Sequence, residues 1–203
     1  PESQAQRQLV IDKLKGITLE HLLAHTSGLD NDTGISPYPE PSRDKAILTF
    51  ARSKVLSKPG EKWAYNNAAY AMLAVIIEQA SGQRFEQYTM GQVFVPAGML
   101  ATAFPPGIEL DKDQRMDRML GGSGSLSMSA HPWGWGYRGM GGVLTNLADM
   151  HAFIRAIDKH AIVKQSTWQD IIRPRLSIGR KLPGGGPDQA YGLGWFVEQG
   201  SGG

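Results

Sequence analysis

The sequence contains no cysteine, which excludes disulfide bonds, thiolate catalysis and metal sites built from thiolates. It also lacks any apolar run of about 18 residues, the length that a membrane-spanning helix requires. Nor is one charge in excess, because 21 lysines and arginines stand against 19 aspartates and glutamates. The net charge of +2 does not favour a nucleic-acid partner. The one close basic group is predicted to be a solvated loop, formed by Arg173, Arg175, Arg180 and Lys181.

What is present is the composition of an ordinary globular chain. Of its 203 residues, 41% are hydrophobic and 20% are charged, which is enough to bury one good core or two small ones. Residues 1–10 are polar and rich in glutamine, unlike a signal peptide. The compartment is left open between the cytoplasm and the periplasm or exterior.

The most structured stretch of the sequence is residues 59–82, PGEKWAYNNAAYAMLAVIIEQASG. It opens with a Pro-Gly turn and carries a Tyr-x-Asn triplet, Tyr65 to Asn67. Apolar residues then recur at helical spacing, and Ser81-Gly82 supply a stop. The pattern predicts a buried helix with Tyr65 at its entrance.

Two interpretations of the triplet follow from that position. The first turn of a helix has unpaired N–H groups and a partial positive charge. A phenol there can share a proton with a nucleophile, and the amide of Asn67 can hold a substrate carbonyl. Alternatively, Tyr65 packs on Trp63 and Asn67 only caps the helix. The triplet alone does not decide between them.

Residues 17–29, ITLEHLLAHTSGL, predict a second helix over 18–25, with Thr18 as its N-cap and Gly28 as its stop. In such a helix His21 and His25 lie four residues apart on one face, a spacing that can share a zinc ion. The segment has no glutamate general base between them, and no third ligand stands nearby. We therefore predict no metal site.

The segment H-L-L-x-H-T-S-G-L, followed by P-G-x-x-x-x-Y-x-N, resembles the serine β-lactamase-like family. That family includes class C β-lactamases, related esterases, D-amino-acid peptidases and penicillin-binding carboxypeptidases. Three further motifs match in the family's order: residues 81–99, with Ala97 in place of a leucine, G-G-V-L-T at 141–145, and Y-G-L-G-W at 191–195. The ordered set is specific, although no single motif is.

The resemblance implies an α/β (α+β) fold of the β-lactamase/transpeptidase type. Residues 1–203 are expected to form the central part of a single domain, mainly helical, with one or two edge strands. One such strand is predicted over 191–197. The family's N-terminal S-x-x-K segment and its C-terminal K/H-T/S-G strand are expected to be lacking.

Ser42 begins the only S-x-x-K in the sequence. In the family this motif carries the nucleophile, with a lysine one turn away to take the proton. However, Ser42 lies downstream of the H-L-L-x-H-T-S-G-L segment, whereas the family's motif lies upstream. It follows a proline-rich loop and precedes an apolar helical pattern, so it is predicted to be an N-cap.

By resemblance, the function is that of a serine hydrolase acting through an acyl-enzyme on an ester, a β-lactam or a D-residue peptide. Tyr65 is expected to relay protons as general base and then acid, and Asn67 to orient the substrate or the lysine. No cofactor is implied, and the partners are an acyl substrate and the missing flanking segments. The chain alone is expected to be inactive. The alternative is a non-catalytic fragment or degenerate relative that binds a peptide or cell-wall ligand, or docks with a complementary chain.

The remaining sequence predicts supporting elements. Asn146 is expected to cap a helix over 147–158, with Leu147, Met150, Phe153, Ile154 and Ile157 on its core face. A helix is expected over 166–172, and a loop over 181–187. The Gly- and aromatic-rich stretch 121–142 could line a substrate site or cover a core edge.

Overall fold

The computed structural model describes residues 8, 12–31, 43, 47, 50–51, 53–104, 138–181 and 188–198. The predictions for Ser42, most of the proline-rich loop, the aromatic residues of 121–137 and the C-terminal glycines lie outside these residues. The helices and strands follow in this order: α2 (Leu19–Leu23), α4 (Asn67–Ser81), α5 (Phe85–Thr89), the π-helix η1 (Met90–Phe94), α6 (Val95–Ala97), α8 (Leu147–Asp158), α9 (Gln165–Ile172), β1 (Leu176–Lys181), β2 (Asp188–Tyr191) and β3 (Phe196–Glu198).

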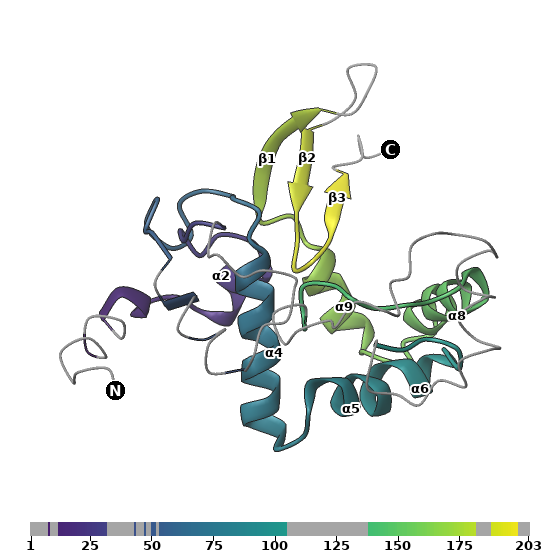
Figure 1. Ribbon diagram of the computed structural model, residues 1–203. Coiled ribbons are helices and arrows are strands. Elements are labelled where there is room, and N and C mark those ends of the chain that lie inside the picture. The colour runs from purple at the N-terminus through teal and green to yellow at the C-terminus, as the bar shows by residue number, and fades with distance from the viewer. Residues whose placement is uncertain are drawn as a thin grey trace, which may run out of the picture.

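Helix α4 runs through the middle of the molecule, with α2 beside it and the small sheet above it (Figure 1). It begins after the Asn66 cap and ends at Gly82, whose backbone is left-handed, so the predicted helix is confirmed. Its most deeply buried side chains are small: Ala68, Ala69, Ala71 and Ala74. Small residues let neighbouring elements approach this helix closely from more than one side.

Two hydrophobic clusters lie against α4. One gathers Ala74 of α4 with apolar residues from the α5–α6 region and α8: Phe85, Phe94, Ala97, Met99, Phe104 and Ala156. The other joins Ala68 and Ala69 to residues on the α2 side: Leu22, Leu29 and Phe50. The chain thus has two small cores rather than one, and α4 contributes to both.

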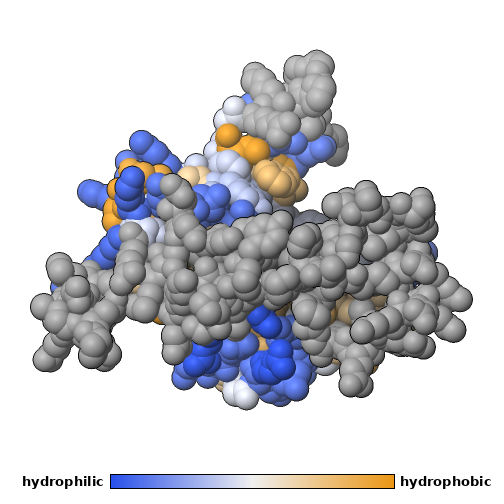
Figure 2. Space-filling model, in the orientation of Figure 1, coloured by the Kyte–Doolittle hydropathy of each residue, from blue (hydrophilic) through white to orange (hydrophobic). Residues whose placement is uncertain are grey.

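The C-terminal strands form a three-stranded antiparallel sheet in the order β1-β2-β3. The single strand predicted over 191–197 is wrong, because β2 ends at Tyr191 and β3 starts at Phe196. Between them the chain turns, and the Gly192 N–H donates to the Trp195 carbonyl at 2.8 Å. The sheet has three strands, where one or two were expected. Lys181, predicted to begin a loop, is the last residue of β1. Apolar surface is visible over this sheet in Figure 2. Phe196 of β3 is 56% exposed.

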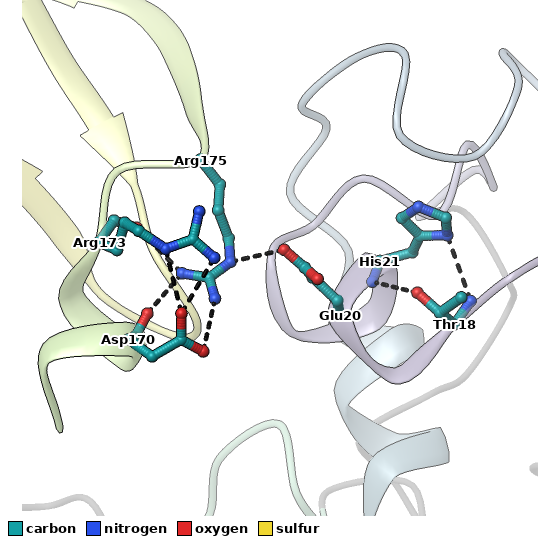
Figure 3. Close-up of polar contacts among 6 residues, drawn as sticks. All are labelled: Thr18, Glu20, His21, Asp170, Arg173 and Arg175. Atoms are coloured by element: carbon teal, nitrogen blue, oxygen red, sulfur yellow. Dashed lines mark hydrogen bonds and ion pairs between the residues drawn. The ribbon is translucent and has the colours of Figure 1, made fainter. Parts of the chain in front are cut away.

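Arg175 connects α2, near the start of the described chain, with α9, which precedes the sheet (Figure 3). Its Nε donates to Glu20 of α2 at 2.8 Å, and its Nη2 donates to Asp170 of α9 at 3.1 Å. The Arg175 side chain is only 8% exposed, so the prediction of a solvated basic group is wrong for Arg175, whereas the Arg173 side chain is 58% exposed. Hydrogen bonds from Arg173, together with the positive charge of both arginines, hold the pKa of Asp170 below its usual value. The N-terminal helix is thereby fixed against the element that leads into the sheet.

Helix α8 has the predicted N-cap, because Asn146 Oδ1 accepts a hydrogen bond from the Asp149 N–H. Its predicted core face is only partly correct, since Ile157 is buried but Leu147 is 89% exposed. Asp149 points inward instead, and its Oδ2 accepts from the Ala101 N–H at 2.8 Å and from Thr102 Oγ1 at 2.6 Å. A polar clamp therefore attaches α8 to the loop after α6, where an apolar stripe was expected. Met150 and Ile154 are also exposed.

We predict that the close approach of Ser57 to Gly28 makes this glycine more important for stability than its positive φ angle alone would. Gly28 and Gly82 both have positive φ, but a Cβ at Gly28 would lie 2.2 Å from the Ser57 carbonyl oxygen, whereas a Cβ at Gly82 meets nothing within 4 Å. Gly82→Ala should lower the free energy of unfolding by about 1 kcal/mol through backbone strain. Gly28→Ala should cost about 1 to 3 kcal/mol more through the clash. Urea denaturation measures both, and equal losses would contradict the close approach.

Candidate active site

A cavity of about 360 Å³ opens where the segment after α2, the start of α4 and the turn after β2 meet. One side of its wall carries polar and aromatic groups: His25, Tyr65, Asn67, Tyr70 and Tyr191. The other side is apolar and is formed largely by the cluster around α5 and α6: Phe85, Phe94, Phe104, Met140 and Val143. Reactive side chains and a hydrophobic surface thus share one space, which is the usual composition of a small-molecule site.

Both residues of the predicted catalytic pair lie on the wall of this cavity. Tyr65 lies in the extended segment before α4 and is 47% exposed, so its phenol is open to a bound molecule. Asn67 is the first residue of α4. The structure therefore brings the two side chains to one open space, while their catalytic roles stay a prediction.

The capping residue of α4 is Asn66, not Asn67. Asn66 Oδ1 accepts from the Ala69 N–H at 2.9 Å, and its Nδ2 donates to the Leu29 carbonyl at 2.8 Å and the Asp30 carbonyl at 3.2 Å. The interpretation in which Asn67 only caps the helix is therefore wrong. Among the described residues, the Asn67 side chain has no hydrogen-bond partner, although its backbone N–H donates to Asn31 Oδ1 at 2.7 Å. Its amide is left available to a ligand.

Tyr65 does not pack as the structural alternative proposed. Its ring lies against His25, with the ring centroids 4.5 Å apart. Trp63 instead contacts Tyr191 and Phe196, at centroid distances of 5.8 and 6.4 Å. Trp63 therefore helps to attach the sheet to this region, and Tyr65 covers the imidazole.

His25 was missed as a site residue because a longer helix was predicted. Helix α2 ends at Leu23, and His25 follows it in a left-handed conformation with φ 57°. His21 lies inside the helix, where its Nδ1 accepts from the Thr18 N–H in a capping box (Figure 3). The two histidines do not share a helix face, so the geometry that would suggest a zinc pair is not formed.

The His25 side chain is 2% exposed and bonds directly to the segment that carries Tyr65. Its Nδ1 accepts from the Asn66 N–H at 3.0 Å, and its carbonyl accepts from the Ala64 N–H at 2.9 Å. Burial lowers the pKa of His25 to about 4, because desolvation disfavours the cation. At neutral pH the imidazole is therefore uncharged, and its Nδ1 carries a free lone pair for the Asn66 amide.

Two further phenols surround His25. The Tyr70 and Tyr191 rings lie 4.8 and 5.0 Å from the imidazole, and Tyr70 Oη donates to the Leu23 carbonyl at 2.7 Å. Burial raises the pKa of both phenols above their usual value, which keeps them protonated at neutral pH. Of the tyrosines that line the cavity, Tyr65 is the most exposed, at 47%.

Within the part of the chain that the structure describes, no group of three His, Asp or Glu residues is arranged to hold a metal ion. None of the described helices combines the length and apolar character needed to cross a membrane. The polar side chains on the described cavity wall are three phenols, the Asn67 amide, the His25 imidazole and the Thr89 hydroxyl.

Comparison with known proteins identifies what this arrangement resembles. The family model "Beta-lactamase" matches residues 9–203. The chain is 28% identical over 189 residues to PbpX of Bacillus subtilis (strain 168), covering 91% of this chain and 44% of PbpX. It is 28% identical over 192 residues to the D-alanyl-D-alanine-carboxypeptidase/endopeptidase AmpH of Escherichia coli (strain K12), covering 88% of this chain and 48% of AmpH. The chain thus spans about half the length of these curated relatives.

Solved structures share the fold. The crystal structure of a penicillin binding protein from Bacillus halodurans matches with a TM-score of 0.71 at 21% sequence identity, covering 98% of this chain and 66% of that one. The predicted β-lactamase/transpeptidase-like fold is confirmed by this likeness. At such low identity the match carries the fold and no more.

The assignment of the cap to Asn66 predicts opposite outcomes for two adjacent substitutions. Asn66→Ala removes the cap and the donor to the buried Leu29 carbonyl, so the free energy of unfolding should fall by about 2 to 4 kcal/mol. Asn67→Ala removes a side chain with no hydrogen-bond partner in the described structure, so the change should stay within about 0.5 kcal/mol. Chemical denaturation of both variants measures the difference. If Asn67→Ala lowered the free energy of unfolding more than Asn66→Ala, the assignment of Asn66 as the cap would be wrong.

Proposed function

The chain belongs to the Beta-lactamase family, whose relatives are serine hydrolases, and on that premise we propose that it carries the acid–base part of an acyl-transfer site. One observation carries the proposal. Tyr65 and Asn67 line the same open cavity, while the residue between them, Asn66, is committed to holding the turn. A half-exposed phenol and an amide with no partner in the described structure are the groups that a substrate can still engage.

In the proposed reaction a serine hydroxyl attacks the acyl carbonyl carbon while the amine of the lysine one turn away takes its proton, which is relayed to the Tyr65 oxygen as that phenol gives up its own proton. The tetrahedral intermediate then collapses as Tyr65 protonates the leaving group, which gives the acyl-enzyme. Water, deprotonated by the same groups, releases the acid and restores the serine. Asn67 donates its amide N–H to the substrate or orients the lysine.

The serine is proposed to come from outside these 203 residues. The only S-x-x-K of the sequence starts at Ser42, which follows the H-L-L-x-H-T-S-G-L segment instead of preceding it. The substrate is proposed to be an ester, a β-lactam or a peptide ending in a D-residue, because each presents an acyl carbonyl and a leaving group that needs a proton. The name of AmpH, a D-alanyl-D-alanine-carboxypeptidase/endopeptidase, supports the last of these.

A second function, binding without catalysis, is favoured by the same position of the S-x-x-K motif. A chain without its own nucleophile could hold a peptide or cell-wall ligand in the cavity, or dock with a complementary chain. The two functions differ in whether an activated acyl group becomes covalently attached once the serine is supplied.

We expect the 203-residue chain by itself to gain no mass when it is incubated with a penicillin or a fluorophosphonate, and to give no burst with a chromogenic β-lactam. The reason is that the S-x-x-K of this sequence, which starts at Ser42, follows the H-L-L-x-H-T-S-G-L segment, whereas the family's nucleophile motif precedes it. Intact-protein mass spectrometry makes the measurement. An adduct mapped to Ser42 would overturn the proposal that the nucleophile comes from elsewhere.

In a protein that contains these residues together with the serine, Tyr65→Phe should lower kcat by about two orders of magnitude, as expected for the loss of an acid–base group. Tyr88→Phe is the matched control, because Tyr88 lies on α5 and does not line the cavity. Steady-state kinetics on both variants make the comparison. Wild-type turnover in Tyr65→Phe would remove this residue from the mechanism.

A further inference from the structure

We propose that His25 is a positioning residue for this reaction, whose unprotonated Nδ1 holds the Tyr65-Asn66-Asn67 turn in place at the cavity wall. The inference rests on the function proposed above, because it concerns how Tyr65 and Asn67 are aimed. His25 lies about forty residues away along the chain, yet its Nδ1 accepts from the Asn66 N–H of this turn and its carbonyl accepts from the N–H of Ala64, the residue before the turn.

The position of the bonded amide is what gives the contact its effect. The Asn66 N–H belongs to the peptide unit that joins Tyr65 to Asn66, and it donates to His25 Nδ1 at 3.0 Å. Asn66 is 1% exposed, so water does not replace a lost acceptor, and an unpaired buried N–H is costly. The backbone between the two functional side chains is therefore fixed by a side chain of another segment.

The imidazole is itself held from several directions. The Tyr70 ring of α4 and the Tyr191 ring of β2 lie 4.8 and 5.0 Å from it, and the Tyr65 ring lies at 4.5 Å. The Leu23 carbonyl, two residues before His25, accepts from Tyr70 Oη at 2.7 Å and from the Gly194 N–H at 3.2 Å. Three elements thus leave the imidazole little freedom to turn away from the Asn66 amide.

Protonation of His25 would replace this hydrogen bond with an unfavourable contact between two donors. An imidazolium carries hydrogen on both nitrogens, so Nδ1 could no longer accept and would face the Asn66 N–H as a second donor. The titratable groups that face the ring are the Tyr65, Tyr70 and Tyr191 phenols. Among the described residues, no carboxylate contributes to the shift in the pKa of His25. Because burial places the pKa of His25 near 4, below its usual 6.5, the neutral form prevails at ordinary pH. The contribution of the His25 hydrogen bond to the free energy of unfolding is fully present above about pH 6.5 and falls as the pH drops toward about 4.

The test compares two substitutions in a protein that holds the complete site. His25→Asn keeps an acceptor oxygen and tolerates a left-handed backbone, whereas His25→Phe keeps a ring and removes the acceptor. We expect His25→Phe to lower kcat at least about tenfold with KM nearly unchanged, because substrate contacts stay while the phenol is misaimed. His25→Asn should stay within about threefold of wild type.

His160→Phe is the control for strain, because His160 also has a left-handed backbone, with φ 56°, but is exposed and lies outside the cavity. It should leave kcat and KM unchanged. Tyr65→Phe in the same assay separates the two proposals. If Tyr65→Phe is active the proposed function fails, whereas if Tyr65→Phe is inactive and His25→Phe is not, only the positioning role fails.

The pH profile decides the case in which His25→Phe does not fold. Wild-type log kcat should fall as the pH approaches about 4, where His25 becomes protonated. His25→Asn has no titrating group there, so this acid limb should be absent. A limb of the same midpoint in His25→Asn would overturn the positioning role, as would equal kcat values for wild type and a folded His25→Phe.

Discussion

The hydrogen bond from the Asn66 N–H to His25 Nδ1 is the contact on which the site depends. It joins the segment after α2 to the entrance of α4, two parts of the chain that are otherwise distant in sequence. Without it, a buried amide would have no acceptor, and the backbone that sets the direction of Tyr65 would lose one of its fixed contacts. The bond requires a neutral imidazole, and the burial of His25 lowers its pKa and keeps it neutral.

The rest of the fold supports this contact from both sides. The small residues of α4 let one hydrophobic cluster form toward α2 and another toward α5, α6 and α8, so the helix that begins at the site is held along its length. Arg175 fixes α2 to α9, and the turn after β2 donates to the Leu23 carbonyl. Polar contacts between distant segments, rather than a large core, therefore place His25. Such contacts leave Tyr65 exposed while holding its backbone.

The sequence predicts the elements whose cause is local. Apolar periodicity locates α4, the Asn146 cap locates the start of α8, and Pro174 marks the end of α9. Ordered motifs predict the fold and select Tyr65 and Asn67, which both line the cavity. Sequence-based prediction fails where tertiary contacts determine the conformation. Helix α2 ends before His25, whose ring accepts a hydrogen bond from Asn66. Arg175 is buried and forms an ion pair with Glu20, and Gly192 and Gly194 form a turn within an alternating apolar pattern. Periodicity cannot locate the partners of His25, Arg175 and Gly194, because Asn66, Glu20 and Leu23 lie far from them in sequence.

The most direct measurement is nuclear magnetic resonance on the nitrogen-labelled chain, looking for scalar coupling across the hydrogen bond between the Asn66 amide nitrogen and His25 Nδ1. The account predicts a resolvable coupling at neutral pH, with His25 Nδ1 shifted as an unprotonated acceptor, and its loss as the imidazole becomes protonated near pH 4. An imidazole that titrates near its ordinary value of 6.5, with no coupling to Asn66 at any pH, would contradict the claim that this bond organises the site.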